Sequence, residues 1–306
     1  MERYTLAKAL TRPDRPLRED EPAMLILTPE ELSHPPALED GWAGLLPHIP
    51  SAGDARRCKL ELKRESLCGT VVTPRFTKGG VRISFGYLLT RHRLVLCDGS
   101  GALHSLVRQL ARGGQWQGGG TGRFFYTLLD HLLAKDLHDL ETLEDRLIQL
   151  EDQVLTGDLA GFNNRLTALR KEALCWFRYY DQLGDLADEL EEDERGFFSQ
   201  EEQRLFHGLE KRLSRLRDEA QLLREYCLQV RELFQAELDL RQNRIMKILT
   251  VVTTLCLPLS LVAGWYGMNF VGMPELSWKY GYPAVIVISI LIVVLCLWVM
   301  KKKKFW

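Results

Sequence analysis

The sequence lacks the motifs that mark disulfide-bonded domains and zinc sites. Its seven cysteines are scattered over positions 58, 68, 97, 175, 227, 256 and 296, and they form no CxxC pair and no Cys/His cluster with zinc-ligand spacing. This distribution predicts a reduced, cytosolic body. The segment Met1–Leu10 also lacks the apolar core of a signal peptide.

The sequence also lacks a loop that would bind a nucleotide phosphate. The glycine-rich stretch GGQWQGGGTG, residues 113–122, is not followed by the Lys-Ser or Lys-Thr pair of a P-loop. No nucleophile motif is present either. We therefore expect neither an ATP-driven pump nor an enzyme, and no organic cofactor.

A strong net charge is missing as well, since 40 basic residues face 41 acidic ones. The charges are unevenly placed. From Ile248 onward they are Glu275, Lys279 and Lys301–Lys304, a net of +4, which leaves -5 for residues 1–247. An acidic body with a basic tail argues against nucleic acid as a partner.

The sequence does contain two long uncharged apolar runs, Ile248–Tyr266 and Ala284–Met300. Each is about as long as a helix needs to cross the hydrocarbon core of a bilayer, ~20 residues. We expect two transmembrane helices in membrane lipid. The alternative is a pair of buried core helices.

Basic residues predict the orientation of these spans. Arg241, Arg244 and Lys247 precede the first span and Lys301–Lys304 follow the second, whereas the link between them carries only Lys279. Because Lys and Arg are retained on the cytoplasmic side, both termini are expected in the cytoplasm of a cell with this protein in its cytoplasmic (inner) membrane.

A long helix is predicted to lead into the first span without interruption. It begins near Ser199, where SQEE offers a capping box, and ~100 Å of helix would run to Tyr266. Such a helix must pack on other helices or on copies of itself. Its apolar residues form a heptad seam, which comprises Leu209, Leu213, Leu216, Ala220, Leu223, Cys227, Val230, Phe234 and Leu238.

Two further helices are expected upstream, over Arg123–Leu155 and Phe162–Leu190. The stretch Asp181–Glu194 carries eight acidic residues, which indicate either a solvated helix tip or a region that attracts divalent cations. Before them, short apolar runs broken by Gly, Pro and charge predict strands. These runs are AMLILT, CKLELK, CGTVVTP, VRISFGYLLT and HRLVLCD. A helix is expected over Ala102–Leu110, and residues 113–122 are expected to be a flexible link.

Four short motifs near the end of the chain resemble the CorA family of divalent-cation channels. They are YGMNF at 266–270, MPEL at 273–276, KYGYP at 279–283 and KKKKFW at 301–306. The resemblance extends back along the long helix and weakens in the N-terminal third. It implies a homopentameric α+β membrane protein, shaped as a funnel, that takes up Mg²⁺ passively, with Co²⁺ and Ni²⁺ as further cargo.

The resemblance also implies a division of the chain. The expected parts are a cytosolic α/β domain (1–120), cytosolic antiparallel helices (121–198), a stalk helix (199–247), a first transmembrane pore helix (248–267), an external loop (268–282), a second transmembrane helix (283–300) and a basic cytosolic tail (301–306).

Particular residues take roles by the same resemblance. Gly267, Met268 and Asn269 would form a selectivity filter, in which five amide oxygens accept hydrogen bonds from the water around a hydrated divalent cation. Glu275 would lie in the external loop. The pore lining and hydrophobic gate would comprise Asn243, Met246, Leu249, Thr253, Leu257, Ser260 and Gly264, which recur at three- and four-residue steps and share one helix face. Packing between helices is the alternative role for Met246, Leu249 and Leu257.

Intracellular Mg²⁺ closes members of this family, and Glu232 resembles an acidic stalk position used for that purpose. Mg²⁺ would thus be both substrate and regulator. The alternative is a solvent-facing Glu232 paired with Arg231 or a nearby Lys.

Two rival functions remain open. A related branch similar to ZntB moves zinc with the same fold, although MPEL in the loop favours magnesium. A two-span scaffold with a partner-binding coiled coil would need no ion flux.

Overall fold

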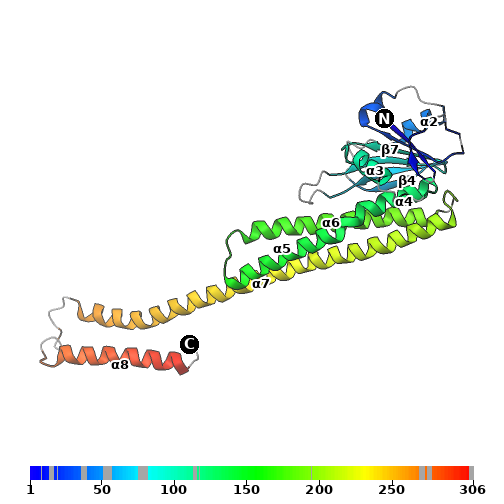
Figure 1. The fold of residues 1–306 in the computed structure, drawn as a ribbon. Coiled ribbons are helices and arrows are strands. Elements are labelled where there is room, and N and C mark those ends of the chain that lie inside the picture. Colours follow the sequence, from blue (N-terminus) through cyan, green and yellow to red (C-terminus); the bar gives the residue numbers. More distant parts are fainter. Residues whose placement is uncertain are drawn as a thin grey trace. The chain divides into compact units, whose positions relative to one another are not determined.

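The computed structural model (Figure 1) describes residues 1–7, 9–13, 17–18, 20–35, 40–50, 57–74, 82–112, 116, 118–193, 195–268, 273 and 278–302. The chain forms two compact units, Met1–Arg231 and Glu232–Trp306. Helix α7 (Gln200–Tyr266) begins in the first unit and ends in the second. The expected stalk and first apolar run are thus one continuous helix.

Within the described residues of the first unit, seven strands form one sheet in the order β2-β1-β3-β7-β6-β5-β4. Neighbouring strands are antiparallel except for β3 and β7, which are parallel. The strands are β1 (Glu2–Leu6), β2 (Leu10–Thr11), β3 (Ala23–Leu27), β4 (Lys59–Leu62), β5 (Leu67–Val72), β6 (Ser84–Leu89) and β7 (Arg93–Asp98).

The five predicted strands, β3 to β7, are confirmed, whereas β1 and β2 were missed. β1 pairs with β3, with Tyr4 opposite Met24. β2 is two residues long, too short for an alternating pattern to reveal it. These strands are therefore defined by their partners in the sheet and not by their own sequence.

One face of the sheet is covered by short helices that follow β3. They are α1 (Pro29–Ser33), α2 (Asp40–Ala43) and the 3-10 turn η1 (Leu46–His48). Trp42 of α2 is 1% exposed and packs with Leu25 and Val95 from the two parallel strands. Burial of such large apolar side chains stabilises the fold by ~1.5–3 kcal/mol each.

Aromatic side chains of α4 (Thr121–Leu132) pack against strand β6. Tyr87 of β6 contacts Phe125, with 4.7 Å between ring centroids. Trp116 packs edge-on against Phe124 at 5.4 Å and donates its indole N–H to the carbonyl of Ala7 at 2.8 Å. The expectation of a flexible link over 113–122 is therefore wrong at Trp116, because burial of the indole and its hydrogen bond hold this residue, and residues 121–122 belong to α4.

The remaining helices are α3 (Ala102–Arg112), the 3-10 turn η2 (Leu133–Lys135), α5 (Asp136–Thr156), α6 (Phe162–Glu192) and α8 (Gly281–Lys302). A single helix over Arg123–Leu155 was expected, but η2 separates α4 from α5. The Leu133 carbonyl accepts from the N–H of Asp136, three residues on, and from Nη2 of Arg212 at 3.1 Å. This side-chain bond from α7 favours the tighter turn over a regular α-helical turn.

The predicted capping box at the start of α7 is confirmed. Ser199 Oγ accepts from the N–H of Glu202 at 3.3 Å, and Glu202 Oε2 accepts from the N–H of Ser199 at 2.9 Å. Glu202 Oε1 also accepts from the N–H of Arg123 at 3.0 Å, near the start of α4. One carboxylate therefore caps two helices.

The apolar seam of α7 is buried in the first unit and then loses its cover. All seam positions from Leu209 to Val230 are buried, Phe234 is half-buried and Leu238 is exposed. The chain therefore covers the seam itself only as far as Val230.

The double cap predicts a measurable loss of stability in Glu202→Ala. Removing the carboxylate leaves helix N–H groups of α4 and α7 unpaired, and we expect the free energy of unfolding to fall by about 1–2 kcal/mol. Denaturant unfolding followed by circular dichroism measures this change. Glu201→Ala is the matched control, because its 73% exposed carboxylate makes only a surface ion pair with Arg123 at 3.2 Å. Equal losses in the two variants would contradict the capping role.

Candidate functional site

Among the described residues, two helices contain stretches long and apolar enough to cross a membrane, and the chain does not bury these stretches as a core. They lie in α7 and α8, and only 0% and 6% of their most apolar windows are buried. A core helix of a soluble protein would be covered by its own chain, so the alternative of buried core helices is contradicted for the isolated chain. Such a surface is compatible with lipid or with further copies of the chain.

The apolar part of α7 has one face that the chain partly buries. In the second unit α8 lies beside this part of α7 (Figure 1), and Cys296 Sγ of α8 is 3.8 Å from the carbonyl oxygen of Thr254. Thr250 is half-buried off this face. The other half-buried positions follow helical spacing and comprise Val251, Leu255, Pro258, Leu259, Val262 and Tyr266. They mark the side of α7 that its own chain shields.

The predicted pore residues lie on the other side of α7. At 100° per residue, their stripe is roughly opposite the half-buried positions. Every member is exposed, with Met246, Leu249 and Leu257 at 53%, 56% and 66%. The full stripe is Asn243, Met246, Leu249, Thr253, Leu257, Ser260 and Gly264. The structure thus brings them onto one free face, while their role in a pore stays a prediction.

The stripe carries no charged side chain, and its part around Met246 and Leu249 has few polar groups that are free to bind water. Thr250 Oγ1 donates to the carbonyl of Met246 at 2.7 Å, and Thr253 Oγ1 donates to that of Leu249. These hydroxyl protons are used within the helix, so the surface around Leu249 is largely apolar. The sequence analysis missed these bonds, although a Thr four residues after a helical carbonyl is a recognisable signal for them.

At the far end of α7 the structure explains the need for glycine. The N–H of Gly267 donates to the carbonyl of Ala263 at 2.9 Å, and a Cβ at Gly267 would lie 2.8 Å from that same oxygen. Met268 is exposed and follows directly. The other predicted residues of this end, Asn269 and Glu275, lie outside the described residues.

Glu232 is exposed on α7, at the first position of the second unit. In the part of the chain that the structure describes, its carboxylate makes no ion pair, so the alternative of a pair with Arg231 is not found. The described residues also contain no group of three or more potential metal-binding side chains. A metal site at Glu232 would therefore need further ligands from outside the described residues of one copy of the chain.

The acidic stretch at the end of α6 is partly neutralised by α7. His207 Nδ1 lies 2.8 Å from Glu191, and Arg217 lies 3.9 Å from Asp181. Burial and the neighbouring acids Asp185 and Asp188 raise the pKa of Glu189. The contacts of Glu191 and Asp181 leave a negative field at Glu189, so they are compatible with a helix end in solvent and with a region that attracts cations.

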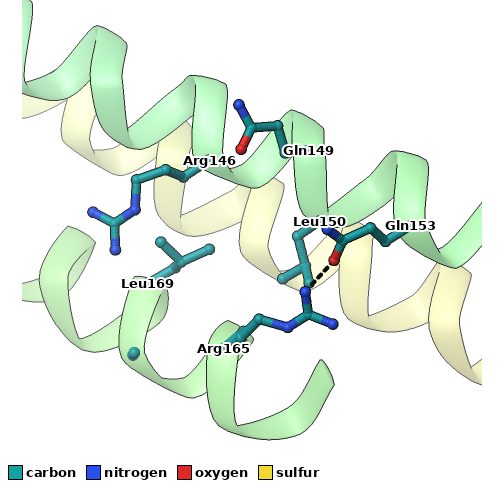
Figure 2. Close-up of a pocket in the computed structure, with 7 residues that line it drawn as sticks. Arg146, Gln149, Leu150, Gln153, Arg165 and Leu169 are labelled. Atoms are coloured by element: carbon teal, nitrogen blue, oxygen red, sulfur yellow. Dashed lines mark hydrogen bonds between the residues drawn. The ribbon is translucent and has the colours of Figure 1, made fainter. Parts of the chain in front are cut away.

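A pocket lies between α5 and α6 (Figure 2). Its lining includes Arg146, Leu150, Arg165 and Leu169. Arg146 Nη1 donates to Glu172 Oε2 at 2.8 Å, and Arg165 donates to Gln153 Oε1. Both guanidinium groups are thus engaged in holding α5 and α6 together, which indicates a structural role for this pocket.

Comparison with known proteins places this arrangement in context. Residues 87–302 match the model of the family described as CorA-like Mg²⁺ transporter protein. The chain is 28% identical over 180 residues to the cobalt/magnesium transport protein CorA of Thermotoga maritima, a match that covers 59% of this chain and 51% of that protein. The chain thus spans about half the length of that relative.

Two solved structures are similar over nearly the whole chain. The first is the CorA magnesium transporter from Methanocaldococcus jannaschii, with a TM-score of 0.77 and 19% identity over 98% of this chain and 96% of that chain. The second is the full-length CmaX protein, with a TM-score of 0.73 and 22% identity over 100% of this chain and 98% of that chain. At these identities the structures establish the fold alone.

If the stripe lines a pore closed by dewetting, a charge on it should hold water there. We expect Leu249→Asp and Met246→Asp to raise the resting ion leak at least about tenfold, which corresponds to a barrier lower by ~1.4 kcal/mol. The measurement is ion current in planar bilayers that contain the purified protein. Leu249→Met keeps the apolar surface and is the control. Wild-type closure in both Asp variants would exclude the gate from this segment.

Proposed function

The chain belongs to the CorA-like Mg²⁺ transporter protein family, and from this premise we propose that it conducts divalent cations passively across the cytoplasmic membrane. Its cargo is Mg²⁺, with Co²⁺ and Ni²⁺ as further substrates. The observation that carries the proposal is the uncharged stripe on α7, which remains exposed although α8 shields the opposite face.

Several copies around a common axis would cover the stripe and create a path through the membrane. The family resemblance implies five copies, with α7 inside and α8 toward lipid. α8 suits that position, since its most apolar window has a mean hydropathy of 3.0 against 2.0 for α7. Exposure of the seam beyond Phe234 supports the same assembly, because apolar helix surface of this kind packs against other helices.

A path without carboxylates suits a cation that keeps its water. Mg²⁺ dehydrates reluctantly. The amide oxygens of Asn269 would accept hydrogen bonds from the water molecules that the ion keeps. Gly267 and Met268 complete this proposed filter. Glu275 of the loop between the spans would add a negative charge near it, opposed by Lys279.

The proposed arrangement in the cell follows the distribution of basic residues. Residues 1–120 and 121–198 are assigned to the cytosol, and 199–247 to the stalk that leads to the pore helix, 248–267. The loop 268–282 faces outward, and 283–300 returns the chain to the basic tail 301–306. Both termini then lie in the cytoplasm.

Reconstitution separates this proposal from its two rivals. Purified protein in liposomes should take up Mg²⁺ without ATP and independently of a proton gradient. Zinc uptake coupled to protons, with no Mg²⁺ flux, would instead favour a ZntB-like activity. No flux of any divalent cation would favour the scaffold.

Asn269→Ala tests the proposed filter. Loss of the amide oxygens removes the groups that hold the hydrated ion but little apolar packing, so we expect Mg²⁺ uptake to fall to the level of empty liposomes. Size-exclusion chromatography with light scattering checks that the assembly persists. Asn164→Ala, at an exposed position of α6 with no assigned role in conduction, is the matched control and should retain the flux. Normal uptake by assembled Asn269→Ala would sink the filter assignment.

Glu232 tests proposed closure by intracellular Mg²⁺. Copies of the acidic body repel one another, and Mg²⁺ bound between them would offset this repulsion. Millimolar Mg²⁺ should therefore slow proteolysis of wild-type protein at least severalfold, and Glu232→Lys should lose most of that protection. Glu225→Lys, upstream on the same helix and bonded to Gln221, is the control. Unchanged protection in Glu232→Lys would remove this residue from the sensor.

A further inference from the structure

A buried carboxyl group lies at the start of α5. Asp136 is the first residue of α5 and is 6% exposed. Tyr179 and Tyr180 of α6 lie in its neighbourhood, and Trp176 stacks on Tyr180 with 5.6 Å between ring centroids. The carboxyl group is thus surrounded by large aromatic side chains and not by water.

Four polar atoms of this cluster lack hydrogen-bond partners in the described part of the chain. They are Asp136 Oδ2, Trp176 Nε1 and the hydroxyl oxygens of Tyr179 and Tyr180. Tyr180 is close enough to Asp136 to influence its ionisation, yet no well-aligned hydrogen bond forms. Because folded proteins pair nearly all buried polar atoms, the cluster requires a proton, a water molecule or an ion that completes it.

The surrounding charges disfavour an ionised Asp136. On its own helix, Asp139 has the same sign. On α6 it meets only the neutral hydroxyls of Tyr179 and Tyr180, because burial raises the pKa of both phenols. Beyond Tyr179 lies Cys58, whose pKa burial raises to about 11, so this thiol is neutral as well.

Arg212 of α7 is the cation that acts on Asp136, and its guanidinium group is already bonded to other residues. Arg212 forms an ion pair with Asp130 and donates Nη2 to the carbonyl of Leu133 at 3.1 Å. Burial and the like charge of Asp139 raise the pKa of Asp136 to about 7, because they outweigh the Tyr180 hydroxyl and the field of Arg212, which both lower this pKa. A carboxylate without a committed partner in an apolar site takes up a proton instead of staying charged.

We propose that the Asp136 carboxyl group is a proton-binding site that is occupied when α5 is packed against α6 and α7, and that release of its proton to solvent water loosens this packing. The protonated group can donate its O–H to a tyrosine hydroxyl, which the carboxylate cannot do. The carboxylate would instead compete with Asp130 for Arg212. This inference does not depend on the proposed transport.

The direction of the pH effect follows from the raised pKa. The folded form binds the proton up to about pH 7, whereas the unfolded chain releases it near the ordinary value of 3.8. The stabilisation is therefore complete below pH 3.8 and is lost as the pH rises to about 7. Between about pH 5 and 8, this one group should raise the unfolding equilibrium constant about a hundredfold.

Infrared difference spectroscopy of the purified full-length protein tests the site directly. A buried protonated carboxyl group has its own C=O band, and in wild type we expect a band that disappears with a midpoint near pH 7. Asp136→Asn should lack that band and should lose the pH dependence of thermal unfolding between pH 5 and 8. Asp145→Asn, an exposed position on the same helix, should retain both.

A second variant keeps the test informative if Asp136→Asn fails to fold. Asp139→Asn leaves the carboxyl group in place and removes the like charge beside it, so the midpoint should move to lower pH. The proposal is overturned if wild type has no such band between pH 5 and 8, as expected for a hydrated carboxylate. It is overturned equally if the band persists in Asp136→Asn or if Asp139→Asn leaves the midpoint unchanged.

Discussion

The continuity of helix α7 is the constraint on which the rest of the structure depends. In a bilayer no water is present to pair a free N–H or C=O, so a spanning segment must satisfy its backbone internally. α7 is helical over Gln200–Tyr266, and the one donor missing within it is that of Pro258, which has no N–H. The carbonyl of Thr254, four residues earlier, lies 3.8 Å from Cys296 Sγ of α8. Because the same helix carries the buried seam of the first unit, protein packing and membrane insertion are imposed on one continuous element.

The apolar residues of α7 are buried by the chain at the start of the helix and exposed toward its end. Through Val230 the chain shields its own apolar seam, but the stripe from Asn243 to Gly264 remains exposed on the side opposite the partly shielded positions. Exposed apolar surface on a membrane helix is satisfied by lipid or by other copies. An uncharged stripe bounded by Gly267 suits a hydrated cation better than a bare one, since it offers no carboxylate to replace the ion's water.

Sequence reasoning was most reliable where a single segment carries its own signal. The runs of β3 to β7, the capping box of Ser199 and Glu202, and the uncharged spans each follow from local periodicity or composition. It failed for segments whose structure depends on a contact with another segment of the chain. β2 exists because β1 offers an edge, η2 because Arg212 reaches Leu133, and Trp116 is held because Ala7 accepts its indole N–H.

The sequence by itself determined the two apolar runs, the long helix and the spacing of the stripe on α7, because hydropathy and helical period are properties of consecutive residues. Only the tertiary structure decided which apolar residues of α7 the chain covers, since the seam keeps one pattern throughout and yet Val230 is buried and Leu238 is exposed. It alone placed Asp136 of α5 beside Tyr180 of α6. Burial and the field around a carboxyl group arise from segments distant in sequence, and no local pattern encodes them.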